Sequence, residues 1–276
     1  MNTKRDSRDP IEVHDTARRV DVQAQRFEDE GLLVVPGAID EAKRLRLLNA
    51  VAAMLRVRID AHGADKAGID ASRLDDSGYL LCEAMSALNA ADHDSIRLLY
   101  ESLARSEALA SILIDEHVIG VARRLMGIDH TNVYVSSNVV RMDVPGDRLF
   151  TLDWHQESSY YGGTPASVQV WSPLWKRSSL EAGSIDVCPG SHREGPLYPD
   201  LANAGSAAGS RQYTVPPDIV RRYPIETVEI DPGDVVFFST YLFHKSSDPS
   251  LQRSVKYSIV CRYSDANDPS FTPFST

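Results

Sequence analysis

The N-terminal part of the chain repeats its apolar residues at the spacing of a helix face. Residues 20–30 and 39–62 show this pattern, and Asp40 stands where a helix-capping residue is expected. A second helical region is predicted from Ser95 to Met126. The polar stretch 65–77 lies between these regions and is predicted to be a loop.

The pattern changes after Gly127 to short runs rich in Val, Tyr, Phe and Ile, separated by Pro, Gly and Asp. These runs predict strands at 132–142, 150–156, 167–175, 184–188, 226–230, 234–243 and 254–263. Helices followed by strands indicate helices packed on an antiparallel sheet system. The small-residue segment 203–210 has no core-forming content and is predicted to be a flexible loop beside the strands.

A chain of 276 residues is long enough for one large β-sandwich or barrel with helical additions. We therefore expect a single domain over residues 1–276, of the mainly β class with N-terminal helices. Residues 1–127 would form a mainly helical region packed on the core, and residues 128–276 would form the core itself.

Composition narrows the expected partners to a small molecule. No apolar run approaches the roughly 18 residues of a membrane span, and the polar first ten residues lead into no apolar segment. We therefore expect no membrane partner, no secretory signal and a cytoplasmic location. A net charge of −10 disfavours nucleic acid, which needs a basic patch. The three cysteines have no paired spacing, which argues against a disulfide framework or a zinc ribbon.

The most informative short pattern is His155-Gln156-Glu157, together with His244 far downstream. If residues 153–158 form a strand, His155 and Glu157 point to the same face. Two histidines and one carboxylate on one side of a metal leave the opposite positions open, as non-haem Fe(II) requires. Glu157 and His244 are 244 − 157 = 87 residues apart, and a jelly roll brings such distant strands together. Taken alone, His-x-Glu equally fits a surface strand with two solvated groups.

The positively charged residue Arg253 begins the run from Arg253 to Cys261. Four residues share its face in the predicted strand: Val255, Tyr257, Ile259 and Cys261. An arginine at the end of such a face must meet an anion or keep its head in water. A carboxylate held by the planar guanidinium fork would satisfy it.

Five motifs stand in order between Asn138 and Tyr263. They are Trp154-His155-Gln156-Glu157, Val170-Trp171-Ser172-Pro173-Leu174, Cys188-Pro189-Gly190-Ser191-His192, Asp231-Pro232-Gly233-Asp234, and His244-Lys245-Ser246 with Arg253. In order and spacing they resemble the phytanoyl-CoA dioxygenase family of Fe(II)/2-oxoglutarate oxygenases, and the stretch from Phe27 to Pro36 resembles the family's usual opening. Glu157 stands where that family usually has Asp.

The resemblance implies a double-stranded β-helix (jelly roll, cupin-like) core flanked by helices, with residues 128–276 as the catalytic core. It implies that the iron ligands at the reaction centre are His155, Glu157 and His244. His192 is expected to have a structural role in its turn rather than to bind metal.

The same resemblance implies a second set of residues, for 2-oxoglutarate. Arg253 would bind the distal carboxylate with help from the Ser246 hydroxyl, and Trp171 would line the pocket. Asn138 and Arg141 are further candidates for contact with the co-substrate or the substrate. The candidates for substrate contact beside the iron motif are Gln156, Tyr160 and Tyr161.

The implied cofactors are Fe(II), 2-oxoglutarate and O₂, and the implied activity is hydroxylation of a C–H bond in a small-molecule metabolite, with decarboxylation of 2-oxoglutarate to succinate. Desaturation, ring formation and epimerisation begin with the same hydrogen abstraction. Two other interpretations stay open. One is a Zn(II) or Mn(II) Lewis-acid enzyme on the same fold, and the other is a non-catalytic metal- or ligand-binding jelly-roll protein.

Overall fold

The structure is a computed structural model that describes residues 23–148, 151–161, 164, 166–197 and 213–272. Helix covers residues 23–30 and the segments α2 (Glu41–His62), α3 (Ser77–Tyr79), α4 (Met85–Ala91), α5 (His93–Ala104), α6 (Glu107–Leu113), α7 (Glu116–Met126), α8 (Ser158–Tyr161) and α9 (Pro217–Val220). Shorter turns are the 3₁₀ segments η1 (Ala64–Ala67), η2 (Ala71–Arg73) and η4 (Ser191–Glu194) and the π-helical turn η3 (Leu80–Ala84).

Capping residues explain where the N-terminal helices begin. Asp40 accepts a hydrogen bond from the Lys43 N–H and starts α2, as its position in the sequence predicted. The single helical region expected over 95–126 is instead three helices. Ser106 and Asp115 each cap a new helix start within it, so the chain turns between α5, α6 and α7.

The strands are β1 (Leu32–Val35), β2 (Val133–Asp143), β3 (Val168–Pro173), β4 (Ile185–Val187), β5 (Glu226–Thr227), β6 (Val235–Ser239), β7 (His244–Ser246) and β8 (Lys256–Asp265). Within the described ranges they form two antiparallel sheets, a five-stranded sheet of order β1-β6-β3-β8-β2 and a three-stranded sheet of order β5-β4-β7. The N-terminal segment supplies one edge of the larger sheet through β1.

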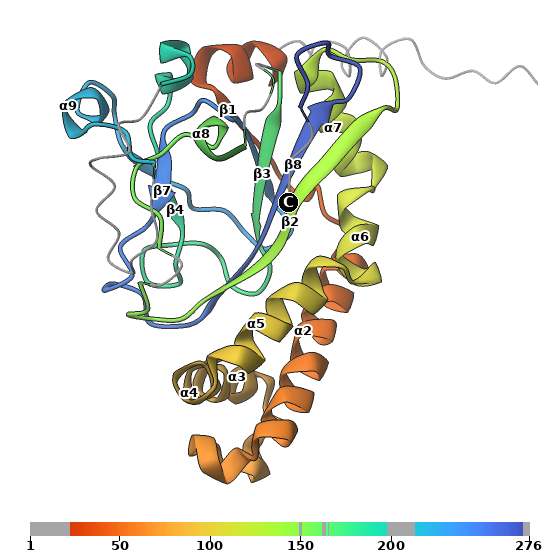
Figure 1. The fold of residues 1–276 in the computed structure, drawn as a ribbon, viewed down its shortest axis with the longest axis vertical. Helices are drawn as coiled ribbons and strands as arrows, with labels where there is room; N and C mark the ends of the chain where they lie inside the picture. Colours follow the sequence, from red (N-terminus) through yellow and green to blue (C-terminus); the bar gives the residue numbers. More distant parts are fainter. Residues whose placement is uncertain (1–22, 149–150, 162–163, 165, 198–212, 273–276) are drawn as a thin grey trace, which may run out of the picture.

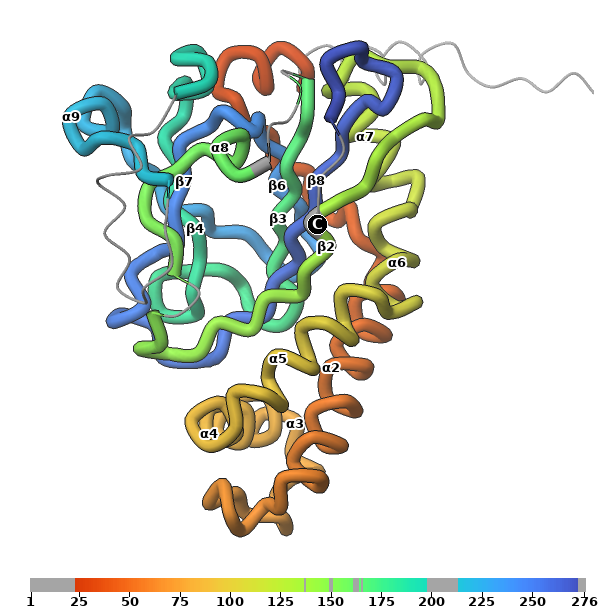
Figure 2. The backbone as a smooth tube through the Cα atoms, in the orientation of Figure 1, coloured from red at the N-terminus to blue at the C-terminus, as the bar shows by residue number. Residues whose placement is uncertain are grey.

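The larger sheet has different neighbours on its two faces. One face packs on the helices and shares with them the main apolar cluster, which includes Val170, Phe237 and Ile259. The opposite face meets the smaller sheet through a second cluster, which includes Trp171 and Phe238. Figure 1 shows β4 and β7 opposite β3 and β8, with α6 and α7 on the far side. Figure 2 shows that α2 to α5 extend beyond the sheets.

The observed class is a mixture of helix and antiparallel sheet. Helices packed on antiparallel sheets are confirmed, but "mainly β" was wrong, because more of the described residues lie in helices than in strands. The helices α3 and α4 account for part of this difference, since the sequence pattern did not predict them. None of the helices in the described ranges has the length and apolar character needed to cross a membrane. The predicted flexible loop at 203–210 lies outside the described residues.

Candidate metal centre

Three buried side chains meet between the two sheets. Within the described part of the chain, His155, Glu157 and His244 are the group that could hold a metal ion, with one ligand atom of each lying within 4.8 Å of the others. The Oε2 atom of Glu157 is 3.7 Å from Nε2 of His155 and 3.6 Å from Nε2 of His244. The sequence-predicted triad is therefore brought together from positions 87 residues apart.

Backbone pairing fixes the two histidines relative to each other. His155 and His244 exchange two hydrogen bonds, N–H to O, of 3.0 and 3.1 Å, and their ring centroids are 4.1 Å apart. The strand expected over 150–156 is absent from the described residues of that range, where His155 forms only an isolated bridge. Glu157 reaches the same site because the chain turns into α8 immediately after it, and the Ser158 N–H donates to the Thr240 carbonyl.

Hydrogen bonds at the far side of each ring set the histidine tautomers. Nδ1 of His155 lies 2.7 Å from the Asp153 carbonyl oxygen, and Nδ1 of His244 lies 3.0 Å from the Leu242 carbonyl oxygen. A carbonyl can only accept, so each Nδ1 carries a proton and Nε2 is the ring nitrogen left to face a metal. Nε2 of His155 is buried without a hydrogen-bond partner among the described residues. Histidine ligands of metals show this arrangement.

Burial and neighbouring charges favour the protonation states of His244 and Glu157 that a metal needs. Burial lowers the pKa of His244, and the adjacent His155 lowers it further, so His244 is neutral near pH 7. Burial by itself raises the pKa of Glu157. Contacts with His155, His244 and the Arg262 guanidinium outweigh burial and hold the pKa of Glu157 well below its ordinary value. A neutral His244 imidazole and an ionised Glu157 carboxylate bind a divalent cation without first losing protons.

A cavity of about 60 Å³ lies beside the three ligands, between the sheets. Its walls are Arg141, Leu152, His155, Glu157, Gln169, Trp171, Ile185, Phe238, His244, Lys245, Ser246, Lys256 and Val260. Both sheets contribute to these walls, so the cavity depends on their packing.

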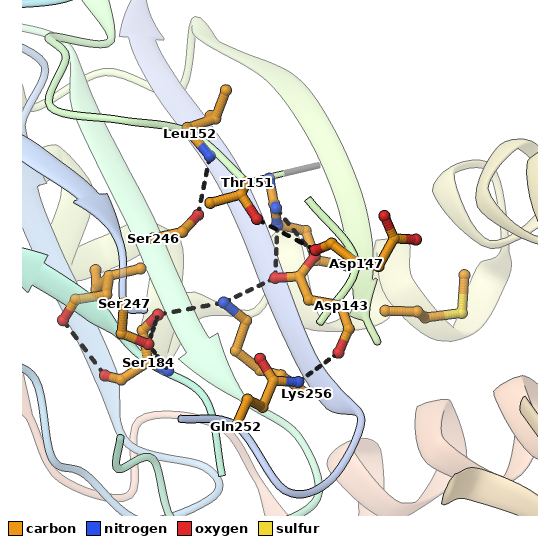
Figure 3. Close-up of polar contacts among 12 residues, drawn as sticks. Asp143, Asp147, Thr151, Leu152, Ser184, Ser246, Ser247, Gln252 and Lys256 are labelled. Carbon is orange, nitrogen blue, oxygen red and sulfur yellow. Dashed lines mark hydrogen bonds and ion pairs between the residues drawn. The ribbon is translucent and has the colours of Figure 1, made fainter. Parts of the chain in front are cut away.

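A buried ion cluster of Arg141, Asp143 and Lys256 lies on β2 and β8, and two of its members, Arg141 and Lys256, line the cavity. Figure 3 shows Asp143 and Lys256 within this cluster. The Asp143 carboxylate is 2.7 Å from Nζ of Lys256 and 2.9 Å from Nη2 of Arg141. Nζ of Lys256 also donates to the Ser184 carbonyl at 3.2 Å. Burial lowers the pKa of Lys256, and the Asp143 charge opposes that shift.

The predicted co-substrate residues divide into two groups. Ser246, Trp171 and Arg141 line the cavity. Asn138 is half-buried and is not among the residues that line it. Arg253 is exposed and is also absent from the lining, and its backbone N–H donates to the Glu181 carbonyl. The structure therefore does not bring Arg253 to the site.

The predicted grouping of apolar residues in the run 253–261 is found in the structure, but this face does not turn to the cavity. Val255, Tyr257, Ile259 and Cys261 lie in the apolar cluster shared with the helices, away from the cavity. The polar face of β8 turns toward the cavity instead, and this places Lys256 in the cavity wall. An apolar strand face is covered by whatever apolar surface the fold supplies, and here the helices supply it.

The candidates for substrate contact are placed as follows. Both ends of the buried Gln156 amide bind the backbone, because Nε2 donates to the carbonyls of Gly195 and Tyr241 and Oε1 accepts from the Leu197 N–H. The Tyr160 ring stands edge-on to His155 with a centroid distance of 5.5 Å. The backbone of Tyr161 lies in α8 and its side chain is not described.

Sequence reasoning missed three polar residues of this region, Lys256, Gln169 and Arg262. Gln169 lines the cavity, and Arg262 touches Glu157. All three lie on strands with alternating patterns, and the polar face of those strands was the available signal. His192, which was expected to be structural, lies against Gly31 and makes a 3.0 Å contact from Nε2 to the Glu28 carbonyl oxygen.

Comparisons with known proteins indicate the family and the fold of the chain. The family model described as phytanoyl-CoA dioxygenase (PhyH) matches residues 27–252. A probable phytanoyl-CoA dioxygenase of Caenorhabditis elegans is 27% identical over 155 residues, which are 55% of this chain and 48% of that protein. The match thus spans about half the length of the curated relative.

Solved structures of low identity share the fold. EctD from S. alaskensis, solved with 2-oxoglutarate and 5-hydroxyectoine, has a TM-score of 0.58 at 19% identity and covers 92% of this chain and 79% of its own. The epimerase SnoN from nogalamycin biosynthesis, solved with Fe³⁺, α-ketoglutarate and nogalamycin RO, has a TM-score of 0.54 at 16% identity, with 94% of each chain covered. The carbocyclase SnoK has a TM-score of 0.51 at 16% identity and covers 92% of this chain and 91% of its own.

The family model covers most of the chain, and it includes the whole segment from Phe27 through the His155, Glu157 and His244 site. The chain belongs to the phytanoyl-CoA dioxygenase family.

Proposed function

We propose that this chain is a non-haem Fe(II)/2-oxoglutarate-dependent oxygenase that hydroxylates a C–H bond of a small-molecule metabolite. The observation that carries the proposal is the convergence of Nε2 of His155, Nε2 of His244 and Oε2 of Glu157 in the wall of a cavity between the sheets. Two imidazoles and one carboxylate on one side of a metal leave its other positions open to a co-substrate and O₂. The two sheets would be those of a double-stranded β-helix.

The residues present fit an iron ion. Nε2 of His155 is a buried acceptor without a partner among the described residues, and a bound cation would satisfy it. His155, Glu157 and His244 would hold the ion. Bound Fe(II) with 2-oxoglutarate and O₂ would supply oxidation of the substrate C–H bond, with decarboxylation of 2-oxoglutarate to succinate.

Lys256 is the residue we propose for the distal carboxylate of 2-oxoglutarate, in place of Arg253. An ammonium group has three donors. Among the described residues, Asp143 and the Ser184 carbonyl take two of them, which leaves a third for a ligand in the cavity that Lys256 lines. The buried position makes this charge-assisted contact stronger than one in water.

Two further residues would support the same carboxylate. The Ser246 hydroxyl accepts from the Leu152 N–H at 3.2 Å, so its own proton is available to donate. The Trp171 indole is buried in the cavity wall, and its N–H has no hydrogen-bond partner among the described residues. We place both beside 2-oxoglutarate. Arg141 is the candidate for contact with the substrate or the metal-proximal carboxylate.

The test is turnover of 2-oxoglutarate by the full chain. Purified protein with Fe(II) and 2-oxoglutarate is followed for O₂ consumption and succinate formation, first without substrate and then with pools of small metabolites. We expect slow, equimolar O₂ loss and succinate formation without substrate. A substrate should accelerate both and gain one oxygen atom, as seen by mass spectrometry. Iron binding without any succinate would overturn the proposal and favour a Lewis-acid or non-catalytic metal protein.

A further inference from the structure

The two carboxylate oxygens of Glu157 have different neighbours. Oε2 faces the two histidine Nε2 atoms at 3.7 and 3.6 Å. Oε1 instead lies 2.5 Å from Nη2 of Arg262. One oxygen thus faces the metal position, while the other is paired with an arginine.

Arg262 is fixed in place by the larger sheet. It lies on β8, is 2% exposed, and stands opposite Gln169 of β3 in the strand register. The Arg262 Nε donates to Gln169 Oε1 at 3.4 Å, and Gln169 itself is 2% exposed and lines the cavity. A guanidinium buried this deeply requires an anion, and Glu157 supplies it.

The pairing bears on the use of Glu at a position where Asp is usual. A glutamate has one more rotatable bond than an aspartate, so its carboxylate can take more positions relative to the histidines. A contact from a rigid strand to Oε1 removes that freedom and turns Oε2 toward the metal position. A buried carboxylate held in this way also offers one oxygen rather than two.

We propose that Arg262 is a positioning residue that makes Glu157 a single-oxygen metal ligand. This inference rests on the proposed metal site. By holding Oε1, Arg262 keeps Glu157 from taking a second coordination position, so that position stays open for a chelating co-substrate. It acts through Glu157 and touches neither co-substrate nor substrate.

Charge and geometry predict opposite effects when Arg262 is removed. Coulomb repulsion between a guanidinium and a divalent cation predicts that loss of the arginine strengthens metal binding. Loss of the ion pair that orients the ligand predicts weaker binding, and removal of such orienting partners typically costs roughly 10- to 100-fold in metal affinity. The proposal requires that orientation outweighs repulsion.

The experiment measures Mn(II) affinity by electron paramagnetic resonance titration of the full chain without 2-oxoglutarate. Arg262→Gln should raise the Kd for Mn(II) by about 10-fold or more, with the apo protein still folded by circular dichroism. Arg262→Lys keeps the positive charge but loses the planar guanidinium group, and it should raise the Kd for Mn(II) by a smaller factor than Arg262→Gln does. Arg97→Gln is the matched control, because Arg97 pairs with Glu101 at 2.7 Å on the exposed face of α5. Its Kd should equal that of the parent.

A double-mutant cycle ties the effect to Glu157. In a Glu157→Gln background, where the charged ligand is already gone, Arg262→Gln should change the Kd by less than about 2-fold. Equal or tighter Mn(II) binding by Arg262→Gln, or an equally large effect in both backgrounds, would overturn the positioning role. If Arg262→Gln does not fold, Arg262→Lys carries the test, and a parental Kd in that variant would overturn it. A parent that binds no Mn(II) would overturn the proposed metal site itself, and this inference with it.

Discussion

The two faces of β8 differ in what they touch. Tyr257, Ile259 and Tyr263 point to the helices, and the two tyrosine hydroxyls donate to the carbonyls of Leu81 and Leu113. Lys256 and Arg262 point the other way, toward the cavity and Glu157. Neighbouring residues of one strand thus serve stability and chemistry separately, because successive side chains point to opposite faces. Changes on the helix face should affect folding, and changes on the cavity face should affect ligands.

The largest expected effect is on the helix face. Ile259 is fully buried, so Ile259→Ala should lower the free energy of unfolding by about 2–5 kcal/mol through lost apolar contact and an unfilled cavity. Urea denaturation of the apo protein measures this change. Val57→Ala is the control, since Val57 is 53% exposed on α2, and it should stay within about 0.5 kcal/mol. If the folded Ile259→Ala variant also binds Mn(II) more weakly than the parent, by as much free energy as it loses in stability, then the two faces do not serve stability and ligand binding separately.

A smaller effect is expected from Lys256→Met on the cavity face. Removing a buried charge partner of a carboxylate typically costs about 2 kcal/mol or more, so the Kd for 2-oxoglutarate should rise roughly 30-fold. The measurement is an isothermal titration of 2-oxoglutarate into the anaerobic Mn(II) form. Mn(II) affinity should change little, because Lys256 pairs with Asp143 and not with the three metal ligands. An unchanged Kd for 2-oxoglutarate would show that its distal carboxylate binds elsewhere.

The smallest expected effect is that of Arg253→Ala, which is also the matched control for Lys256→Met. The Arg253 side chain is exposed and outside the cavity wall, so its removal should change the Kd for 2-oxoglutarate by less than about 2-fold. The same titration measures it. A rise comparable to that of Lys256→Met would restore Arg253 as the carboxylate partner and would require a rearrangement of the 247–255 segment on binding.

The sequence predicted the three proposed ligands better than it predicted the strands around them. The resemblance placed His155, Glu157 and His244 together, and the structure brings them together. The local sequence pattern could not show which backbone pairing brings these three residues together. His155 forms a bridge with His244 rather than part of a strand, and such pairing depends on a segment 89 residues away (244 − 155).

Arg253 is not found in the cavity wall for a related reason. Alternation along 254–263 correctly separates an apolar from a polar face, but it does not say which one turns to the cavity. That choice depends on the helices, because their apolar surface covers Tyr257 and Ile259. The sequence pattern merged α5 to α7 into one region and did not predict α3 and α4, so the cover for the apolar face was not recognised.

The measurement that tests the central claim most directly is Fe(II) stoichiometry under anaerobic conditions. The parent and His117→Ala, whose histidine is exposed on α7, should each retain about one Fe(II) per chain after removal of free metal. His155→Ala and His244→Ala should retain none, since the two remaining ligands cannot hold a labile divalent ion. One Fe(II) retained with parental affinity by either variant would contradict the site described above.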